Sequence, residues 1–148
     1  MKCSSERSVH SERFSDGHFF RNRIVQGEDI DELGHVNNIV WISYVVQLAV
    51  THARFLGWDL IEKRLPEATW VIHSQKITYH APAFAGDEVF EETWISLIKG
   101  ARCIRQTRIH SGSRLLLSAE TTWVWIERET GRARRVPAEL LAKANVER

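Results

Sequence analysis

The feature that most constrains the fold is a long apolar run that directly follows an acidic loop. The loop, GEDIDELGHVNN, spans residues 27–38, and the run, IVWISYVVQLAVTHARFL, spans residues 39–56. The few polar side chains that interrupt the run are Ser43, Gln47, Thr51, His52 and Arg54. A helix that is apolar on nearly every side is normally buried in a protein core. The run therefore predicts a buried helix around which the rest of the domain packs.

The ends of this helix are also marked in the sequence. Asn37 and Asn38 have short polar side chains that accept hydrogen bonds from the free N–H groups of a first helical turn. Gly57 is a typical C-terminal breaker. We expect a helix from about Asn38 to Leu56, whose N–H-rich, positive end faces the acidic loop.

The rest of the chain consists mainly of short apolar runs separated by turn residues, which is the pattern of antiparallel strands. We expect a first strand over Phe19–Gln26, a connector over Trp58–Glu67 and a short helix over Pro137–Ala144. Glycine marks the changes of direction between the later apolar runs, and this pattern predicts an antiparallel meander. The four strands predicted there are Trp70–His80, Asp87–Ile98, Ala101–His110 and Arg114–Arg128.

Those strands have apolar side chains on both faces. In the last of them, Trp123 and Trp125 alternate with Val124 and Ile126, so large apolar groups occupy both parities. An antiparallel sheet with one wet face alternates apolar and polar residues more cleanly. We therefore expect the helix to cover one face of the sheet and a second subunit to cover the other, in a homodimer or a homotetramer.

Composition restricts the class of protein. At 148 residues, with a hydrophobic share of 43%, the chain is long enough for one domain with a sizeable core. The net charge of +1 gives no electrostatic reason to expect a nucleic acid or an anionic membrane as a partner. Cys3 and Cys103 form neither a disulfide framework nor a CxxC metal pattern.

The first residues differ in character from the rest. Residues 1–18 are polar, charged and aperiodic, so we expect a disordered tail followed by one domain over residues 19–148. This segment lacks the apolar stretch of a secretory signal. The apolar run at 39–56 is slightly short for a membrane span and contains Arg54. These features predict a cytoplasmic protein with no membrane segment.

The acidic loop and the helix after it resemble the hotdog-fold acyl-CoA thioesterases of the 4-hydroxybenzoyl-CoA thioesterase type. The shared signature is an Asp-x-Asp turn, a glycine, a short apolar-polar step and a long central helix, present here as DIDELGHVNN followed by IVWISY. The resemblance continues through about Leu140. It implies an α+β hotdog fold, in which a curved antiparallel sheet wraps around one long helix. It also implies hydrolysis of an acyl-CoA to a carboxylic acid and free CoA, without a metal or an organic cofactor.

The same resemblance assigns roles within the loop. In the family the second Asp of the pair is catalytic, as general base or nucleophile, and it matches Asp31 when Gly34 takes the place of the family glycine. The backbone N–H that polarises the thioester carbonyl then belongs to Asn38. Asp29 becomes a support residue, and we expect Asp29 and Gly34 to lie beside the substrate. A base or nucleophile together with a carbonyl-polarising donor is what thioester cleavage requires. By residue type alone, both aspartates also suit a purely structural role in capping the turn and the helix.

His35 is the third candidate catalytic residue. It is suited to orienting substrate or holding Asp31, and equally suited to being a loop histidine packed against the helix start. Asp29, Asp31 and His35 have the residue types of a metal site. However, no second histidine has convincing ligand spacing, so we expect none.

Basic residues are expected where the phosphates of CoA bind. Lys99, Arg102 and Arg105 around one predicted turn are the candidates, and the segment Arg132–Arg135 is a second group of arginines. A solvated charged hairpin explains either group equally well. The six tryptophans favour a roomy apolar acyl pocket, although core packing explains them as well.

Two related mechanisms fit the loop less well. Plant-type acyl-carrier thioesterases share the HVNN step but have a catalytic Asn where this chain has Leu33. Hotdog hydratases have Asn-Pro after their Asp, where this chain has Glu32 and Leu33. A non-catalytic hotdog module, which binds acyl chains or serves as an assembly subunit, remains the alternative to an enzyme. Such a module would have no need of Asp31.

Overall fold

The computed structural model describes residues 9–144, which form a single sheet and a few helices. The long helix is α1, Asn38–Phe55, and the short ones are α2, Trp58–Lys63, α3, Ala138–Lys143, and the 3-10 turn η2, Gly27–Asp29. The strands are β1 Val9–Ser15, β2 His18–Ile24, β3 Ala68–Tyr79, β4 Glu88–Lys99, β5 Arg102–Ser111 and β6 Arg114–Glu127.

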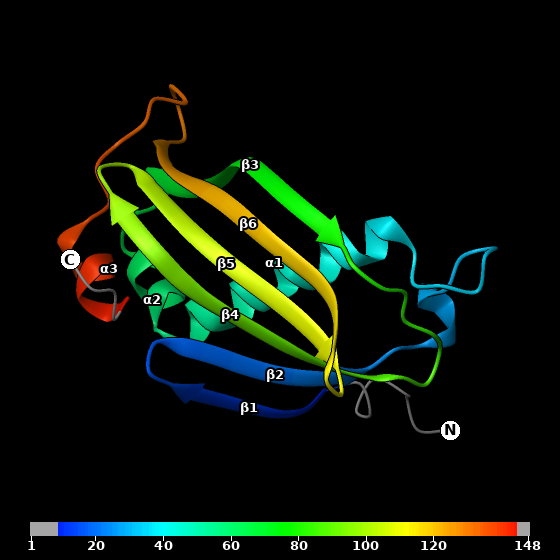
Figure 1. The fold of residues 1–148 in the computed structure, drawn as a ribbon. Coiled ribbons are helices and arrows are strands. Elements are labelled where there is room, and N and C mark those ends of the chain that lie inside the picture. The colour runs from blue at the N-terminus through cyan, green and yellow to red at the C-terminus, as the bar shows by residue number, and fades with distance from the viewer. Residues whose placement is uncertain (1–8, 145–148) are drawn as a thin grey trace, which may run out of the picture.

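The strands form one antiparallel sheet in the order β1-β2-β4-β5-β6-β3. The sheet curves, and α1 lies across one of its faces (Figure 1). The helices α2 and α3 lie at one end of the sheet, and the loop that leads into α1 lies at the other. This arrangement confirms the predicted α+β hotdog architecture, in which a curved sheet wraps around one central helix.

The order of the strands corrects the predicted meander. Of the four strands predicted as a meander, only β4, β5 and β6 follow one another as neighbours, because β3 pairs with β6 and β2 pairs with β4. The loop over residues 80–87 takes the chain from β3 across the sheet to β4. On the way the Ala83 carbonyl accepts from the Val36 N–H at 2.9 Å, and the Gly86 N–H donates to the Val25 carbonyl at 2.9 Å. A long connection of this kind has no local signature that distinguishes it from a hairpin.

The prediction of a disordered tail over residues 1–18 is wrong from residue 9 onward. Strand β1 pairs with β2 through a tight turn at Asp16 and Gly17, which both have positive φ, at 49° and 79°. The strand is polar because it lies at an edge of the sheet, and its one large apolar side chain, Phe14, packs against His52 and Phe55. Residues 1–8 of the predicted tail lie outside the described residues.

Helix α1 covers the core with one face only. Its buried residues share a helical stripe, and they are Trp41, Tyr44, Val45, Leu48, Ala49 and His52. Burying a side chain of this size stabilises the fold by about 1.5–3 kcal/mol. On the opposite side, Ile39 is 75% exposed and Val50 is 45% exposed. The predicted burial on every side is therefore not achieved within one chain.

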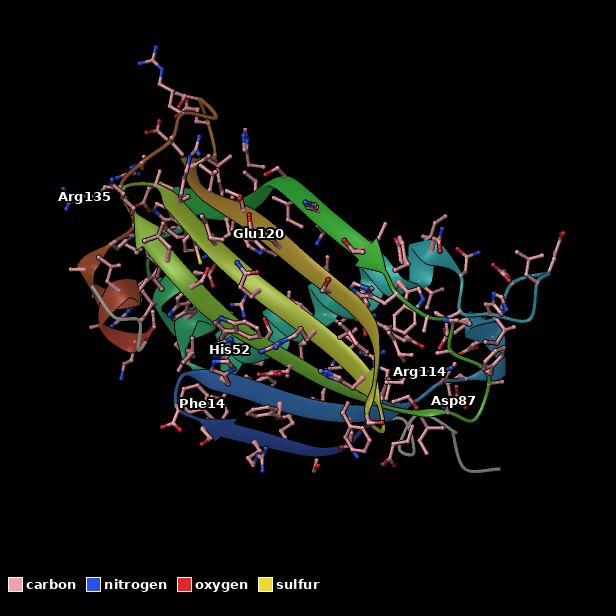
Figure 2. The ribbon with its side chains drawn as sticks, in the orientation of Figure 1. Phe14, His52, Asp87, Arg114, Glu120 and Arg135 are labelled. Carbon is pink, nitrogen blue, oxygen red and sulfur yellow. The ribbon has the colours of Figure 1, made fainter. Side chains whose placement is uncertain are left out.

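The core contains a buried histidine and a buried arginine in direct contact. Arg105 Nη1 donates to His52 Nδ1 at 2.7 Å and to Thr93 Oγ1 at 3.1 Å. A guanidinium can only donate, so Nδ1 is the acceptor and His52 is the neutral tautomer with its proton on Nε2. Burial first, and then the charge of Arg105, lower the pKa of His52 to about 3. Figure 2 places His52 near Phe14, whose ring centroid is 5.9 Å from that of His52.

This histidine makes the fold sensitive to acid. The unfolded chain takes up the His52 proton near its ordinary pKa of 6.5, whereas the folded chain takes it up only near 3. Protons therefore favour unfolding in this window, and the stabilisation is complete above pH 6.5 and decreases as the pH falls. Between pH 7 and pH 5 we expect His52 to reduce the free energy of unfolding by about 2 kcal/mol.

The measurement is urea unfolding at both pH values, for the wild type and for His52→Gln. Glutamine offers Arg105 an oxygen acceptor but does not titrate, so the difference between the two proteins isolates the histidine. The pH dependence of the variant should be flatter by about 2 kcal/mol. Equal pH dependences would contradict the assignment of a neutral buried His52.

Candidate active site

The acidic loop is closed around Asp31. Asp31 Oδ1 accepts from the Leu33 N–H at 2.9 Å and from the His35 N–H at 3.4 Å, and the Asp31 N–H donates to the His35 carbonyl at 2.8 Å. Gly34 sits inside this turn with φ +82°, a left-handed conformation that favours glycine. Both side-chain bonds use Oδ1, so Asp31 is held in place with Oδ2 free of protein donors in the described part of the chain.

The start of α1 presents a free backbone donor. Asn37 is the N-cap, and its side chain accepts from the Ile39 N–H at 2.9 Å, while its carbonyl accepts from the Trp41 N–H. Asn38 is the first helical residue, and its N–H donates to no group within residues 9–144. The positive end of the helix dipole adds to the polarising effect of this N–H. The Asn38 N–H is thus a backbone donor that the described residues leave unused.

A cavity of about 270 Å³ lies at the start of α1, and Asn38 is one of its lining residues. It is lined by the helix start and by the end of β3, through His35, Val36, Asn38, Trp41, Tyr79, His80, Ala81 and Pro82. The structure therefore brings the two candidate residues His35 and Asn38 together at this cavity, and the His35 ring packs edge-on against Phe84. Asp31 lies on the adjoining turn and does not line the cavity of the single chain.

Two lining residues, Tyr79 and His80, were not among the predicted site residues. Tyr79 Oη is 3.5 Å from the Asn38 carbonyl, and His80 Nε2 is 2.8 Å from Ser118 Oγ. Their only sequence signal is that they end a strand directly before Ala81 and Pro82. Nothing in that pattern relates them to a loop forty residues earlier.

Asp29 anchors the loop to the helix. Tyr44 Oη donates to Asp29 Oδ2 at 2.5 Å, and the Asn37 N–H donates to the Asp29 carbonyl at 3.0 Å. Burial, followed by the hydrogen bond to Asp29, raises the pKa of Tyr44, so the phenol keeps its proton and remains a donor. Asp29 and Gly34, which we expected beside the substrate, both lie outside the lining of the cavity. Asp29 thus connects the acidic loop to α1 and lies outside the cavity lining.

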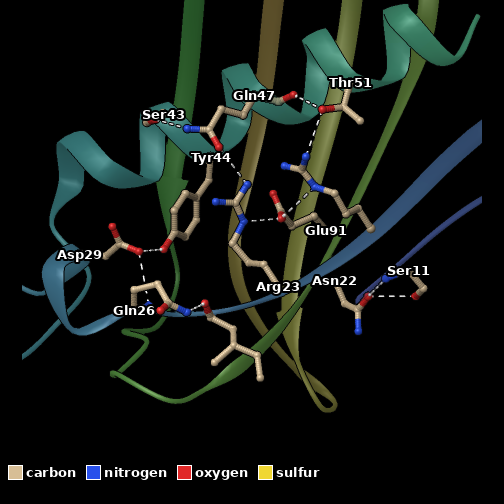
Figure 3. A network of polar contacts seen from close by, with 12 residues as sticks. Ser11, Asn22, Arg23, Gln26, Asp29, Ser43, Tyr44, Gln47, Thr51 and Glu91 are labelled. Atoms are coloured by element: carbon tan, nitrogen blue, oxygen red, sulfur yellow. Dashed lines mark hydrogen bonds and ion pairs between the residues drawn. The ribbon is translucent and has the colours of Figure 1, made fainter. Parts of the chain in front are cut away.

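A buried ionic network lies behind Tyr44 (Figure 3). The Arg23 guanidinium sits 3.8 Å from the centre of the Tyr44 ring, and its Nε donates to Glu91 Oε1 at 2.7 Å. Arg23 Nη2 also donates to Gln47 on α1 at 3.2 Å, and Arg21 lies 3.6 Å from the same Glu91 oxygen. Glu91 is only 1% exposed, and its single negative charge is shared by the two arginines. The network connects the anchor of the loop to β2, β4 and the middle of α1.

The predicted phosphate-binding group is not assembled as expected. Lys99 and Arg102 face each other across the β4–β5 hairpin and are exposed, whereas Arg105 is buried in the core. The prediction that Arg105 joins them at a pocket mouth is therefore wrong. Arg132–Arg135 are exposed in the segment after β6. This segment and the hairpin both lie at the end of the sheet opposite the acidic loop (Figure 1).

Residues 11–144 contain no group of three His, Cys, Asp or Glu side chains arranged to hold a metal ion. Of the helices that the structure describes, none is both long and apolar enough to cross a membrane.

A family model described as the thioesterase-like superfamily matches residues 25–144. The chain belongs to this superfamily. The matched segment begins just before the acidic loop and includes α1, α2, strands β3 to β6 and α3. A search of curated proteins found no match.

Several solved structures have the same fold as this chain, and some of those proteins are named as thioesterases. A 1,4-dihydroxy-2-naphthoyl-CoA thioesterase from Synechocystis has a TM-score of 0.77 at 19% identity, covering 86% of this chain and 96% of that one. A thioesterase from Thermus thermophilus, complexed with coenzyme A and Zn, has a TM-score of 0.73 at 22% identity, covering 84% and 90%. A Staphylococcus aureus protein in complex with CoA has a TM-score of 0.79 at 17% identity, covering 90% and 85%. At these identities the likeness establishes the fold.

The anchor of the loop predicts a specific stability effect. Tyr44→Phe removes the donor to Asp29 and leaves its half-buried carboxylate without that bond. We expect the free energy of unfolding to fall by about 1–3 kcal/mol, the usual effect of losing a hydrogen bond to a charged group. Chemical denaturation of the purified variant measures it.

Tyr79→Phe is the matched control. Its hydroxyl is exposed and makes only the 3.5 Å contact with the Asn38 carbonyl, so the change should stay within about 0.5 kcal/mol. If the two variants lost equal stability, the Tyr44–Asp29 bond would have no special part in holding the loop.

Proposed function

We propose that this protein is an acyl-CoA thioesterase that hydrolyses an acyl-CoA to a carboxylic acid and free CoA. One observation carries the proposal: Asn38, whose N–H has no acceptor within the described residues, lines a cavity at the positive end of α1 beside the loop that holds Asp31. Membership of the thioesterase-like superfamily supports it. So do the fold relatives complexed with coenzyme A.

The proposed reaction needs no group beyond this chain, water and the substrate. A water oxygen adds to the thioester carbonyl carbon while the Asp31 carboxylate takes the proton. The carbonyl oxygen gains negative charge and accepts a hydrogen bond from the Asn38 N–H. The positive end of the helix dipole stabilises the same negative charge. The C–S bond then breaks, and the CoA sulfur leaves and recovers the proton. A direct attack by Asp31, giving an anhydride that water opens, leads to the same products.

A second copy of the chain would complete this site. Strand β3 is twelve residues long, pairs with β6 alone in the described chain, and exposes Val71 and Ile72. A long edge strand with apolar side chains pairs readily with another strand. The apolar side chains that α1 leaves exposed, such as Ile39, give a second surface for a partner to cover. We therefore assign a homodimer that pairs through β3, with a homotetramer as a further assembly.

The symmetry of such a dimer gives the basic β4–β5 hairpin a role at the active site of the other subunit. An antiparallel β3–β3 pairing reverses the direction of every element in the second subunit. The partner's β4–β5 hairpin then lies on the same side of the assembly as the acidic loop of this chain. Lys99 and Arg102 of the partner subunit become the candidates for binding CoA phosphates, while the active site lies between the subunits.

The catalytic assignment is tested by Asp31→Asn, which keeps the shape and capping ability of the side chain but removes its charge. We expect kcat to fall by a factor of about 10²–10⁴ and KM to change little, since the carboxylate acts in the transition state. The assay is thiol release from a panel of acyl-CoAs, first with the wild type. Asp29→Asn is the matched control and should reduce stability more than turnover.

The outcomes separate the proposed functions. Near-wild-type turnover of Asp31→Asn would refute the carboxylate assignment, and a more severe effect of Asp29→Asn would move it to Asp29. A wild type that binds acyl-CoA in calorimetry but releases no thiol from the panel would favour the non-catalytic acyl-binding module.

The assembly is tested by light scattering at micromolar concentration. The wild type should have at least the mass of a dimer, and Val71→Lys combined with Ile72→Lys should shift the mass toward a monomer, because the charges oppose edge pairing. Leu60→Lys is the control, since Leu60 is an exposed apolar residue on α2, outside β3. A monomeric wild type would contradict the assignment.

A further inference from the structure

A second cavity lies between α1, α2 and the sheet, away from the start of α1. Its volume is about 250 Å³, and its lining includes Ala49 and Ala53 of α1. Asn38 lies eleven residues before Ala49, which corresponds to about 16 Å along a helix axis at 1.5 Å per residue. None of the residues that line the first cavity lines this one. Within one chain the two cavities are therefore separate.

The walls of this cavity are aromatic and flat. Trp58 and Trp70 stack with ring centroids 5.5 Å apart and planes inclined by 16°, and Trp123 lines the cavity from β6. The small side chains Ala49 and Ala53 leave space beside them. Drug-sized ligands occupy pockets of about 300–1,000 Å³, so this space suits a smaller molecule. The walls favour a ligand with a flat or compact apolar body.

Arg105 forms the polar end of the same cavity. It is 2% exposed, and its hydrogen bonds within the described chain, to His52 and Thr93, both use Nη1. Both partners are neutral, and none of the ion pairs among residues 11–144 involves Arg105. Arg21 and Arg23, by contrast, share the carboxylate of Glu91. Burial lowers the pKa of Arg105 to about 10, so the guanidinium is still charged at neutral pH.

A buried cation without a counter-charge is a costly arrangement. An anion that enters the cavity relieves this cost and gains charge-assisted hydrogen bonds from the guanidinium. The indole N–H groups of Trp58, Trp70 and Trp123 are buried and make no hydrogen bond among the described residues, so they are not accessible donors in the cavity. The donor that an anion meets there is the Arg105 guanidinium.

The charge of the ligand is limited by two acidic residues of α2. Asp59 and Glu62 also line the cavity, together with the exposed Arg54 of α1, and burial first, then Asp59, raise the pKa of Glu62. Two carboxyl groups disfavour a dianion such as a phosphate more than a single carboxylate. They also disfavour the polyphosphate part of CoA. A ligand with one negative charge and an apolar body therefore suits both the Arg105 end and the aromatic walls of the cavity.

We propose that this cavity binds a small carboxylic acid as its anion, with the carboxylate on Arg105 and the apolar body between the tryptophan side chains. The site is independent of thioester hydrolysis, and it does not use Asp31 or Asn38.

The experiment is a titration of the ¹⁵N-labelled full chain, followed through the cross-peaks of its six indole N–H groups. The probes are benzoate, its neutral analogue benzamide, and inorganic phosphate. Benzoate should shift the indole peaks of Trp58, Trp70 and Trp123, with a Kd below about 1 mM. Benzamide and phosphate should each bind at least about tenfold more weakly, because one lacks the charge and the other the apolar body. Single Trp→Phe variants assign the peaks.

Trp94 supplies an internal control for these shifts. It stacks on His18, with ring centroids 4.4 Å apart, and does not line the cavity. Its indole peak should not move with benzoate. Equal shifts at Trp94 would show non-specific binding and overturn the proposal.

Two variants test the residues. Arg105→Gln should weaken benzoate binding by about tenfold or more while leaving benzamide binding unchanged. Because that substitution alters a buried network, Ala53→Leu provides a second test that fills the cavity and leaves Arg105 in place. It should abolish the shifts. The proposal is overturned if benzoate and benzamide bind alike, if millimolar benzoate moves no cavity indole, or if Ala53→Leu binds as the wild type does. Asp31→Asn should bind benzoate normally, so a failure of the proposed hydrolysis would leave this result unaffected.

Discussion

The burial of one face of α1 against the curved sheet is the constraint on which the rest of the structure depends. The helix buries Trp41, Tyr44, Leu48 and His52 along one stripe, and the sheet must curve to reach all of them. This packing fixes the direction of the helix, so its N-terminus meets the acidic loop at one end of the sheet. It also leaves the opposite stripe of the helix uncovered within one chain. The candidate site and the candidate subunit interface thus follow from the same packing.

The core accommodates its buried arginines in two different ways. Arg21 and Arg23 lie around Glu91, so that two positive charges meet one negative charge, and Gln47 and Thr51 on α1 accept further hydrogen bonds from them. This network supports Tyr44, which in turn holds Asp29 and the loop. Among the described residues, Arg105 has only neutral hydrogen-bond partners, and it lines a cavity. The first arrangement pairs its cations with a carboxylate of the same core, whereas the second has capacity left for a ligand.

The two cavities have complementary chemistry. The one at the start of α1 offers a free backbone N–H and a nearby carboxylate, which is a combination suited to a reacting carbonyl. The one between α1, α2 and the sheet offers a cation and aromatic walls, which suit a bound anion. The benzoate titration and the thiol-release assay address these two sites separately.

The sequence by itself determined the features whose causes lie close together along the chain. The helix at Asn38–Phe55 follows from a continuous apolar run with a cap at Asn37 and a breaker at Gly57, and these signals act within a few residues. The turn around Asp31 follows in the same way from Gly34, and four later strands lie within about two residues of their predicted ends. The family resemblance then connected these local features to a fold.

Only the tertiary structure decided which distant residues meet. The pairing of β3 with β6, the use of a polar segment as β1 and the burial of Arg105 all depend on the neighbours that the sheet supplies. The Tyr44–Asp29 bond and the lining of both cavities likewise join residues from separate elements. The sequence pattern of a strand is the same at the edge of a sheet and in its centre. The sequence likewise does not distinguish an exposed arginine from a buried one. Burial and partners are properties of the packed chain, so no local pattern can encode them.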